Sequence, residues 1–218
     1  MISADLRLLR SRALHTRGPA RVFAGDARNL AEHLPEQSVD IIFASPPYPT
    51  DVEYTRQTRA ELYFLGFVRT MEDVRAIKKR MVRGSPKNIY KGDNNERLVA
   101  RYRSVQRISR EIHERIKGKN WGWDYARMVR EYFGDMLLSL REMLRVLRPG
   151  GWAMLVVGDQ TCKGVMIPVT AILRRIGLDL GFAEAYVEQV RKRRSTTHSM
   201  ALPENVLRFR KAGEGDCG

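Results

Sequence analysis

The sequence predicts an α/β fold: a doubly wound, mainly parallel sheet that ends in an antiparallel pair of strands and carries a basic helical insertion. Nearly continuous apolar runs at 39–44 and 152–157, each bounded by turn residues, are typical of strands buried on both faces of a parallel sheet. Between them, apolar residues recur at helical spacing over about 124–147. Strands that alternate with helices favour a parallel sheet.

The elements before the first of these strands are short. We expect a helix over residues 3–15, a strand from Arg21 to Ala24, and a second helix over about 28–34 that ends at Pro35.

The elements after the long helix complete the sheet. Arg148-Pro149-Gly150-Gly151 forms the turn into the strand at 152–157, and a further helix opens near Pro168, because proline is favoured in the first helical turn. Two last strands are expected at about 183–190 and 205–210.

Composition narrows the class of protein. The 218 residues are 43% hydrophobic, enough for one core with an added lobe, and the formal net charge of +14 favours a polyanionic partner, either nucleic acid or an anionic membrane surface. The sequence contains no apolar run long enough to span a bilayer and no apolar signal core, so we expect a cytoplasmic protein. Cys162 and Cys217 provide neither a disulfide framework nor a metal cluster.

The excess positive charge is concentrated in one stretch. Residues 69–119 hold sixteen basic and six acidic residues, a difference of +10. We divide the chain into core parts at 1–68 and 124–212, a helical basic insert at 69–123 and a tail at 213–218. The insert is expected to grip phosphates, with Lys78, Lys79 and Arg80 as candidates, although a solvated helical surface has the same pattern.

Ser45-Pro46-Pro47-Tyr48 directly follows the strand at 39–44, where open α/β sheets bind ligands. Two consecutive prolines stiffen the turn and remove two amide donors. The Ser45 hydroxyl and the Pro46 carbonyl could accept the hydrogens of an exocyclic amino group on a nucleic-acid base, which favours a more tetrahedral and more nucleophilic nitrogen. Tyr48 could stack on a base that has left the duplex. The plainer alternative is a proline-rich turn with a packing tyrosine.

The stretch from Ser45 to Phe67, SPPYPTDVEYTRQTRAELYFLGF, resembles the S-adenosylmethionine-dependent N4-cytosine/N6-adenine DNA methylases. Their signature is a Ser/Asp/Asn-Pro-Pro-Tyr/Phe motif followed by a tyrosine-containing helix and a leucine-glycine-aromatic patch. Residues 158–182 and 191–211 also resemble these enzymes. The resemblance implies a Rossmann-like class I methyltransferase sheet, with S-adenosylmethionine as cofactor and DNA as partner. Serine in first place is commoner among the N4-cytosine members, which favours cytosine over adenine.

The resemblance also implies a cofactor contact. Gly25-Asp26-Ala27 matches the place where a carboxylate meets the adenine amino group of the cofactor, and Asp26 has the required acceptor chemistry. A helix N-cap is the structural alternative for Asp26, and the two roles are compatible.

Two features that the family carries are not found. The chain has no Gly-rich turn after a first strand and no acidic residue that ends a second strand. We therefore expect an incomplete sheet whose first strands are missing, from a truncated or split enzyme, with a companion chain as the source of those strands and of the Gly-rich motif.

Four consecutive basic residues, Arg191-Lys192-Arg193-Arg194, fall in the last predicted hairpin and suit phosphate contacts or a solvated hairpin equally. The functional hypotheses are DNA amino-methylation, RNA or protein amino-methylation, and a nucleic-acid-binding remnant without catalysis.

Overall fold

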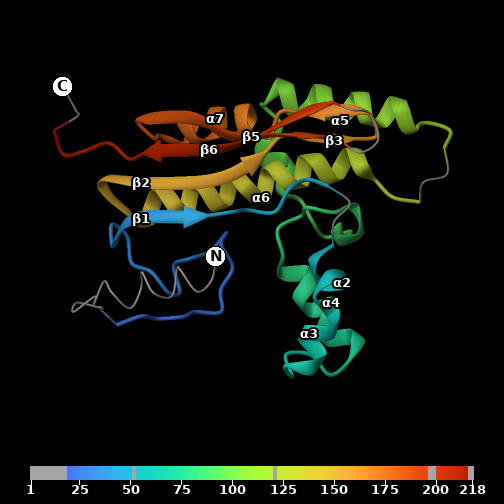
Figure 1. Ribbon diagram of the computed structural model, residues 1–218, viewed down its shortest axis with the longest axis horizontal. Coiled ribbons are helices and arrows are strands. Elements are labelled where there is room, and N and C mark those ends of the chain that lie inside the picture. Colours follow the sequence, from blue (N-terminus) through green and yellow to red (C-terminus); the bar gives the residue numbers. More distant parts are fainter. Residues whose placement is uncertain (1–18, 51–52, 120–121, 196–199, 216–218) are drawn as a thin grey trace.

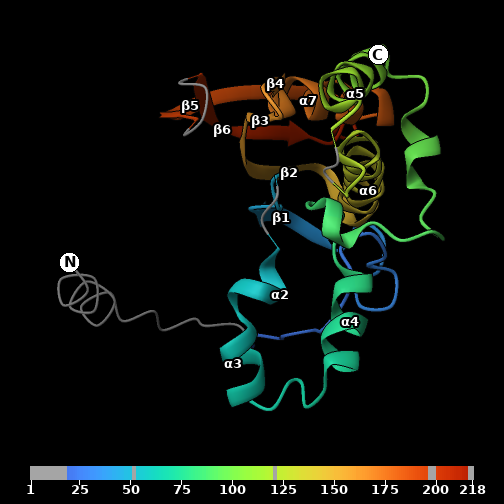
Figure 2. The same cartoon turned by 90° about the vertical axis from the view of Figure 1, so that its right-hand side faces the viewer.

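The computed structural model describes residues 19–50, 53–119, 122–195 and 200–215 (Figure 1). The helix predicted at 3–15 lies outside these residues. The elements form a mixed sheet with helices packed on one face, and an arm of short helices extends away from it (Figures 1 and 2). The predicted α/β class is confirmed.

The main sheet has four described strands in the order β1-β2-β6-β5. These are β1 (Val39–Ala44), β2 (Leu147–Gly158), β6 (Ala201–Arg210) and β5 (Glu184–Arg194). β1 and β2 run parallel, whereas β2–β6 and β5–β6 are antiparallel. The predicted final antiparallel pair is therefore present. The expectation of a mainly parallel sheet is wrong for the described strands, because only one of their three pairings is parallel.

Three helices cover one face of the sheet, and the hydrophobic core lies between them and that face (Figure 2). They are α5 (Arg103–Ile116), α6 (Tyr125–Val146) and α7 (Val169–Leu180). The Asp124 side chain caps α6 by accepting from the Arg127 amide at 2.8 Å. Apolar side chains of α6 meet those of β2 and β6 in one cluster, in which Phe133, Leu155 and Phe209 are fully buried. The long helix predicted at 124–147 is thus confirmed.

The opposite face of β1 is open. Ile41 and Phe43 are 60% and 71% exposed, so the prediction that this strand is buried on both faces is wrong. The physical reason is its position: β1 is an edge strand of the described sheet, and α5–α7 cover only the other face. The companion chain suggested by the sequence stays a prediction.

The segment before β1 differs from its prediction. Residues 21–24 form no strand and residues 28–34 form turns in place of a helix. Val22 is 96% exposed, and the described sheet provides no strand beside this segment with which it could pair. An extended apolar run without a hydrogen-bonding neighbour gains too little to form a strand.

A small hairpin was missed by the sequence reasoning. β3 (Gln160–Cys162) pairs antiparallel with β4 (Val165–Ile167). Lys163 and Gly164 between them have φ values of 51° and 79°. Two successive positive φ values are typical of the tight type I′ turn that joins such strands.

The basic insert divides into two parts. Its first part, α4 (Met71–Arg80), lies in an arm that extends from the body (Figures 1 and 2). The arm also contains α2 (Tyr54–Gln57) and α3 (Arg59–Phe64), which precede the predicted insert. The short 3-10 helices η1 (Pro86–Asn88) and η2 (Asn95–Val99) lead back to α5, which packs on α6 through Val105, Ile108 and Ile112. The insert's second half thus belongs to the core cluster, while the proposed unit boundaries stay a prediction. Among the described helices, not one is both long and apolar enough to cross a membrane.

Candidate active site

The turn Ser45–Tyr48 lies at the carboxyl end of the parallel pair β1–β2. It follows β1 directly, and β2 ends beside it at Gly158. A Cβ atom on Gly158 would lie 3.4 Å from Cζ of Tyr48, which places the tyrosine ring against the end of β2. Ser45 is exposed, and the other three residues are half-buried. The turn therefore stands at the ligand-binding edge of an α/β sheet, as the sequence predicted.

A cavity of about 300 Å³ opens beside this turn, lined by Ser45, Pro47, Tyr54, Met81 and Val82. Its walls are largely apolar, with the Ser45 hydroxyl as a polar group. This combination suits a flat ring with one polar edge, because an apolar pocket with few placed polar groups binds and orients such ligands. Met81 and Val82 directly follow α4, so the insert and the SPPY turn both contribute residues to the cavity wall.

Gly84 fixes the distance between the insert and the motif. The Thr50 amide donates to the Gly84 carbonyl oxygen at 2.9 Å. A Cβ atom on Gly84 would lie 2.9 Å from the backbone oxygen of Tyr48 and 3.5 Å from Cβ of Pro47. Gly84 is thus a point at which the insert touches the motif.

The Tyr48 hydroxyl donates a 2.8 Å hydrogen bond to Oε1 of Glu204, which lies on β6. Burial, followed by this hydrogen bond and the charge of Glu204, raises the pKa of Tyr48 to about 12. Glu204 is also paired with Arg191, whose hydrogen bond is the main cause of a lowered Glu204 pKa. The Arg193 guanidinium carbon lies 5.3 Å from the centre of the Tyr48 ring.

The predicted cofactor-binding residues Gly25, Asp26 and Ala27 lie in a turn. The Asp26 carboxylate accepts from the Arg28 amide at 2.9 Å and from the Arg28 guanidinium at 2.7 Å. Burial acts to raise the pKa of Asp26, but the hydrogen bonds and charge of Arg28 outweigh it, so the pKa is lowered. Asp26 caps no helix, because the predicted helix is absent. The Arg28 guanidinium also donates to the Arg80 carbonyl oxygen at 2.9 Å, which links this turn to the residue before Met81 in the cavity wall.

Asp135 on α6 joins three segments around the cavity, and its side chain is fully buried. Its carboxylate accepts from Arg28 Nη1 at 2.8 Å, from the Arg83 amide at 2.9 Å and from Asn95 Nδ2 at 2.6 Å. Sequence reasoning missed both Asp135 and Glu204. The available signal for Asp135 was a carboxylate within the apolar run of the long helix, which indicates a buried polar anchor.

The basic residues predicted to contact nucleic acid have different surroundings. Lys78 forms a 3.2 Å ion pair with the buried Glu53, and Lys79 lies 5.9 Å from the centre of the Tyr90 ring. Arg80 follows at the end of α4, and its role stays a prediction. In the hairpin, Arg191, Lys192 and Arg194 are all exposed, and Arg191 is paired with Glu204. Their roles in DNA binding also stay predictions.

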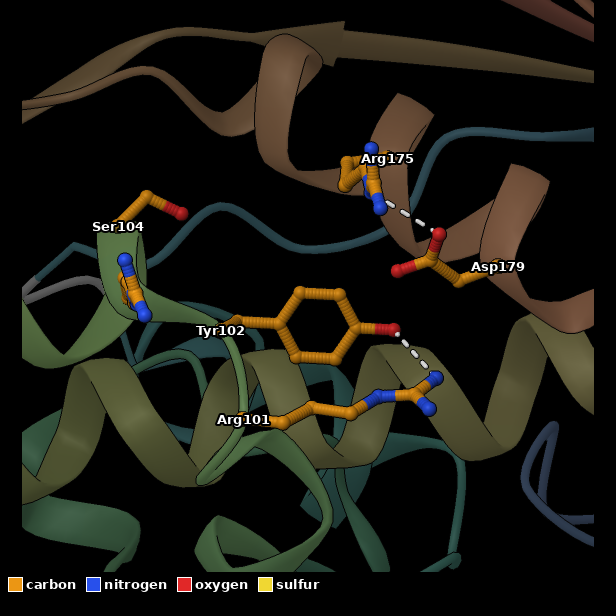
Figure 3. Close-up of a pocket in the computed structure, with 6 residues that line it drawn as sticks. Arg101, Tyr102, Ser104, Arg175 and Asp179 are labelled. Carbon is orange, nitrogen blue, oxygen red and sulfur yellow. Dashed lines mark hydrogen bonds and ion pairs between the residues drawn. The ribbon is translucent and has the colours of Figure 1, made fainter.

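A second cavity, of about 640 Å³, lies between the start of α5 and α7 (Figure 3). Arg101 donates to the Tyr102 hydroxyl at 3.1 Å, and Arg175 pairs with Asp179 at 2.9 Å. No residue of the SPPY turn lines this larger cavity, so we place the candidate chemistry at the smaller cavity. Within the described residues, no group of three or more His, Cys, Asp or Glu side chains is arranged to hold a metal ion.

No family profile matches the chain. The sequence is similar to the type II methyltransferase M.BsoBI of Geobacillus stearothermophilus, with 21% identity over 229 residues that cover 97% of this chain and 44% of that protein. It is also similar to M.AvaI, a type II methyltransferase of Nostoc sp. and of Anabaena variabilis, with 27% identity over 174 residues in each case, covering 76% of this chain and 35% of the relative. The chain thus spans less than half the length of these relatives.

Among solved structures, TTHA0409 of Thermus thermophilus, a candidate DNA modification methylase, matches with a TM-score of 0.42 and 19% identity, covering 89% of this chain and 55% of that one. Its complex with S-adenosyl-L-methionine also matches with a TM-score of 0.42. The sequence similarity to type II methyltransferases confirms the resemblance drawn from the SPPY stretch.

Proposed function

We propose that this chain contributes the base-binding site of a DNA amino-methyltransferase, which moves a methyl group from S-adenosylmethionine to an exocyclic amino nitrogen. The observation that carries the proposal is the SPPY turn, open to a cavity at the carboxyl end of the parallel strand pair. The similarity to type II methyltransferases supports it. We favour N4 of cytosine as the target, because serine stands first in the motif.

The residues of the turn and those that line the cavity have separate tasks in this scheme. Pro46 and Tyr48 are not among the lining residues, but they adjoin Ser45 and Pro47, which are. Tyr54, Met81 and Val82 provide the apolar wall against which a base lies. The Ser45 hydroxyl and the Pro46 carbonyl accept the two amino hydrogens, which turns the nitrogen lone pair out of the ring. Tyr48 stacks on the base. Acceptors fixed in place before the reaction lower its barrier without reorganisation.

When bound, S-adenosylmethionine supplies an electrophilic methyl group on a positively charged sulfur. Asp26 fits the adenine end of this cofactor by its chemistry, because its side chain is 31% exposed and its carboxyl stays ionised through its lowered pKa. An ionised carboxylate has roughly four acceptor positions. Arg28 uses most of them, so the adenine amino group would share Asp26 with Arg28.

The test is a methyl-transfer assay with the radiolabelled cofactor on DNA, RNA and protein, with the purified chain alone and with the predicted companion chain added. We expect label in DNA alone, and nucleoside mass spectrometry should identify N4-methylcytosine. Label in RNA or protein would contradict the DNA assignment, and N6-methyladenine would contradict the choice of base.

The second candidate is a nucleic-acid-binding chain without catalysis, favoured by the Arg28 guanidinium that already occupies Asp26. It predicts DNA binding that weakens steeply with salt, no cofactor binding by calorimetry and no transferred label. Cofactor binding that Asp26→Ala abolishes would exclude it.

A further inference from the structure

The SPPY turn has a support that its own sequence does not reveal. Glu204 on β6 and Arg193 on β5 both contact Tyr48, although Glu204 is 156 positions away in the chain. The Tyr48 hydroxyl donates to Glu204, the Arg193 guanidinium lies over the Tyr48 ring, and Arg193 Nε is 3.7 Å from Glu204 Oε1. Each of the three side chains therefore touches the other two.

We infer that Glu204 and Arg193 are positioning residues that fix the plane of the Tyr48 ring for stacking on the target base, an inference that rests on the proposed function. A tyrosine side chain has two free torsions. The hydrogen bond to Glu204 restrains the end of the ring, and the cation over its face restrains its tilt. Because Arg193 occupies one face, a base can stack only on the other.

Gly158 at the end of β2 makes room for this arrangement. A Cβ atom there would lie 2.4 Å from Nη2 of Arg193 and 3.4 Å from Cζ of Tyr48. Any side chain at position 158 would displace the guanidinium from the ring. The lack of a side chain at Gly158 thus leaves room for the contact between Arg193 and Tyr48.

The four basic residues of the hairpin divide into two pairs. Side chains alternate between the faces of a strand, so Arg191 and Arg193 share one face and Lys192 and Arg194 share the other. Arg191 and Arg193 both form ion pairs with Glu204, although the Arg191 side chain is 65% exposed. Lys192 and Arg194 are exposed as well and lie on the other face of the strand. The run that suggested four phosphate contacts therefore contains a pair directed at the motif, and Lys192 and Arg194 provide matched controls.

The first experiment needs no substrate. Tyrosine labelled with ¹³C at Cζ reports ionisation by NMR, and Tyr48→Phe assigns the signal. Tyr48 should stay protonated up to about pH 11 in the unaltered chain, because its pKa is raised to about 12. Glu204→Gln should bring its titration back toward the ordinary value of 10.0, and Lys192→Gln should leave it unchanged. Identical Tyr48 titrations in Glu204→Gln and the unaltered chain would overturn the inference.

The second experiment separates positioning from phosphate binding. Arg193→Gln should lower kcat about tenfold, as expected for one lost orienting contact. Its slope of log affinity for DNA against log salt should not change. A phosphate contact would instead reduce that slope by about 0.9 with kcat unaltered, and that result would overturn the assignment. Arg193→Lys, which keeps a cation near the ring, should recover part of the lost rate.

A double-variant cycle tests whether Tyr48 and Glu204 act as one unit, provided that urea unfolding shows each variant to be folded. Tyr48→Phe keeps the ring but removes the donor, so it should lower kcat as Glu204→Gln does, and combining the two should cost no more than either alone. Additive losses would overturn the link between the two side chains. A chain that transfers no methyl group would contradict the proposed function, while the NMR titration would still decide the Tyr48–Glu204 contact.

Discussion

Two carboxylates hold the segments that border the cavity, and their surroundings differ. Asp135 is fully buried and takes hydrogen bonds from three separate segments. The Glu204 side chain is 10% exposed and meets two hairpin arginines at the edge of the site. Loss of the first leaves buried donors without an acceptor, whereas the second contacts Tyr48, which we propose stacks on the target base. Stability should therefore depend on Asp135, and catalysis on Glu204.

The largest expected effect is on stability. Asp135→Asn removes the charge that faces the largely buried Arg28, and an amide oxygen cannot replace two carboxylate oxygens. Breaking a buried ion pair on one side costs about 3 kcal/mol or more. Urea unfolding should show this loss, while Asp40→Asn, which removes an exposed pair with Arg148, should cost less than about 1 kcal/mol. Equal losses in the two variants would remove the distinction between anchor and surface pair.

A smaller effect is expected where the insert touches the motif. Gly84→Ala places a methyl group 2.9 Å from the Tyr48 carbonyl oxygen, so the turn must shift. Overpacking of this kind costs about 1–3 kcal/mol, and the displaced turn should also lower methyl transfer. Gly92→Ala is the control, because nothing lies within 4 Å of its added Cβ atom. If Gly84→Ala leaves the rate intact, the insert does not set the position of the motif.

The contribution of the Asp26–Arg28 pair to stability should depend on pH. The folded-state pKa of Asp26 lies below its ordinary value of 3.8, so the stability it contributes is present above pH 3.8 and is lost as the pH falls through the lower, folded-state pKa. We expect urea unfolding to show that the free energies of unfolding of the unaltered chain and of Asp26→Asn become more similar as the pH falls from 7 to 3. A constant gap across this range would show that the pair does not titrate as described.

The smallest effect is expected from Tyr132 on α6. This residue is fully buried, and its hydroxyl has no hydrogen-bond partner among the described residues. Tyr132→Phe removes an unsatisfied polar atom and should be neutral or stabilising by up to about 1 kcal/mol. A clear loss of stability in urea would reveal a partner for this hydroxyl.

Sequence patterns predicted the elements whose signal is local. The apolar spacing around Phe133 and Leu140 predicted α6, and the turn residues after Ala44 placed the SPPY motif at the end of β1. The exposure of Phe43 could not be predicted in this way, because it depends on what lies across the sheet. The strand expected at Arg21–Ala24 failed for the same reason, since a strand needs a neighbour.

The site was predictable only in part. The SPPY letters indicated the position of the turn, and its chemistry stays a prediction. The partners of Tyr48 come from strands at the other end of the chain. A run of four basic residues reads as one charged patch, whereas strand alternation directs Arg191 and Arg193 to Glu204. The sequence shows four basic residues in a row, but only the pairing of β5 with β6 shows that Arg191 and Arg193 contact Glu204.

The most direct test of the SPPY site compares Ser45→Ala with Ser38→Ala in a single-turnover methyl-transfer assay on DNA. Ser38 lies at the start of the segment leading into β1, and its hydroxyl donates to the Pro35 carbonyl oxygen at 2.7 Å, away from the cavity lining. We predict a drop of about tenfold or more for Ser45→Ala, as for one lost transition-state hydrogen bond, and an unchanged rate for Ser38→Ala. Equal rates in both variants would contradict a role for the SPPY hydroxyl at the amino group.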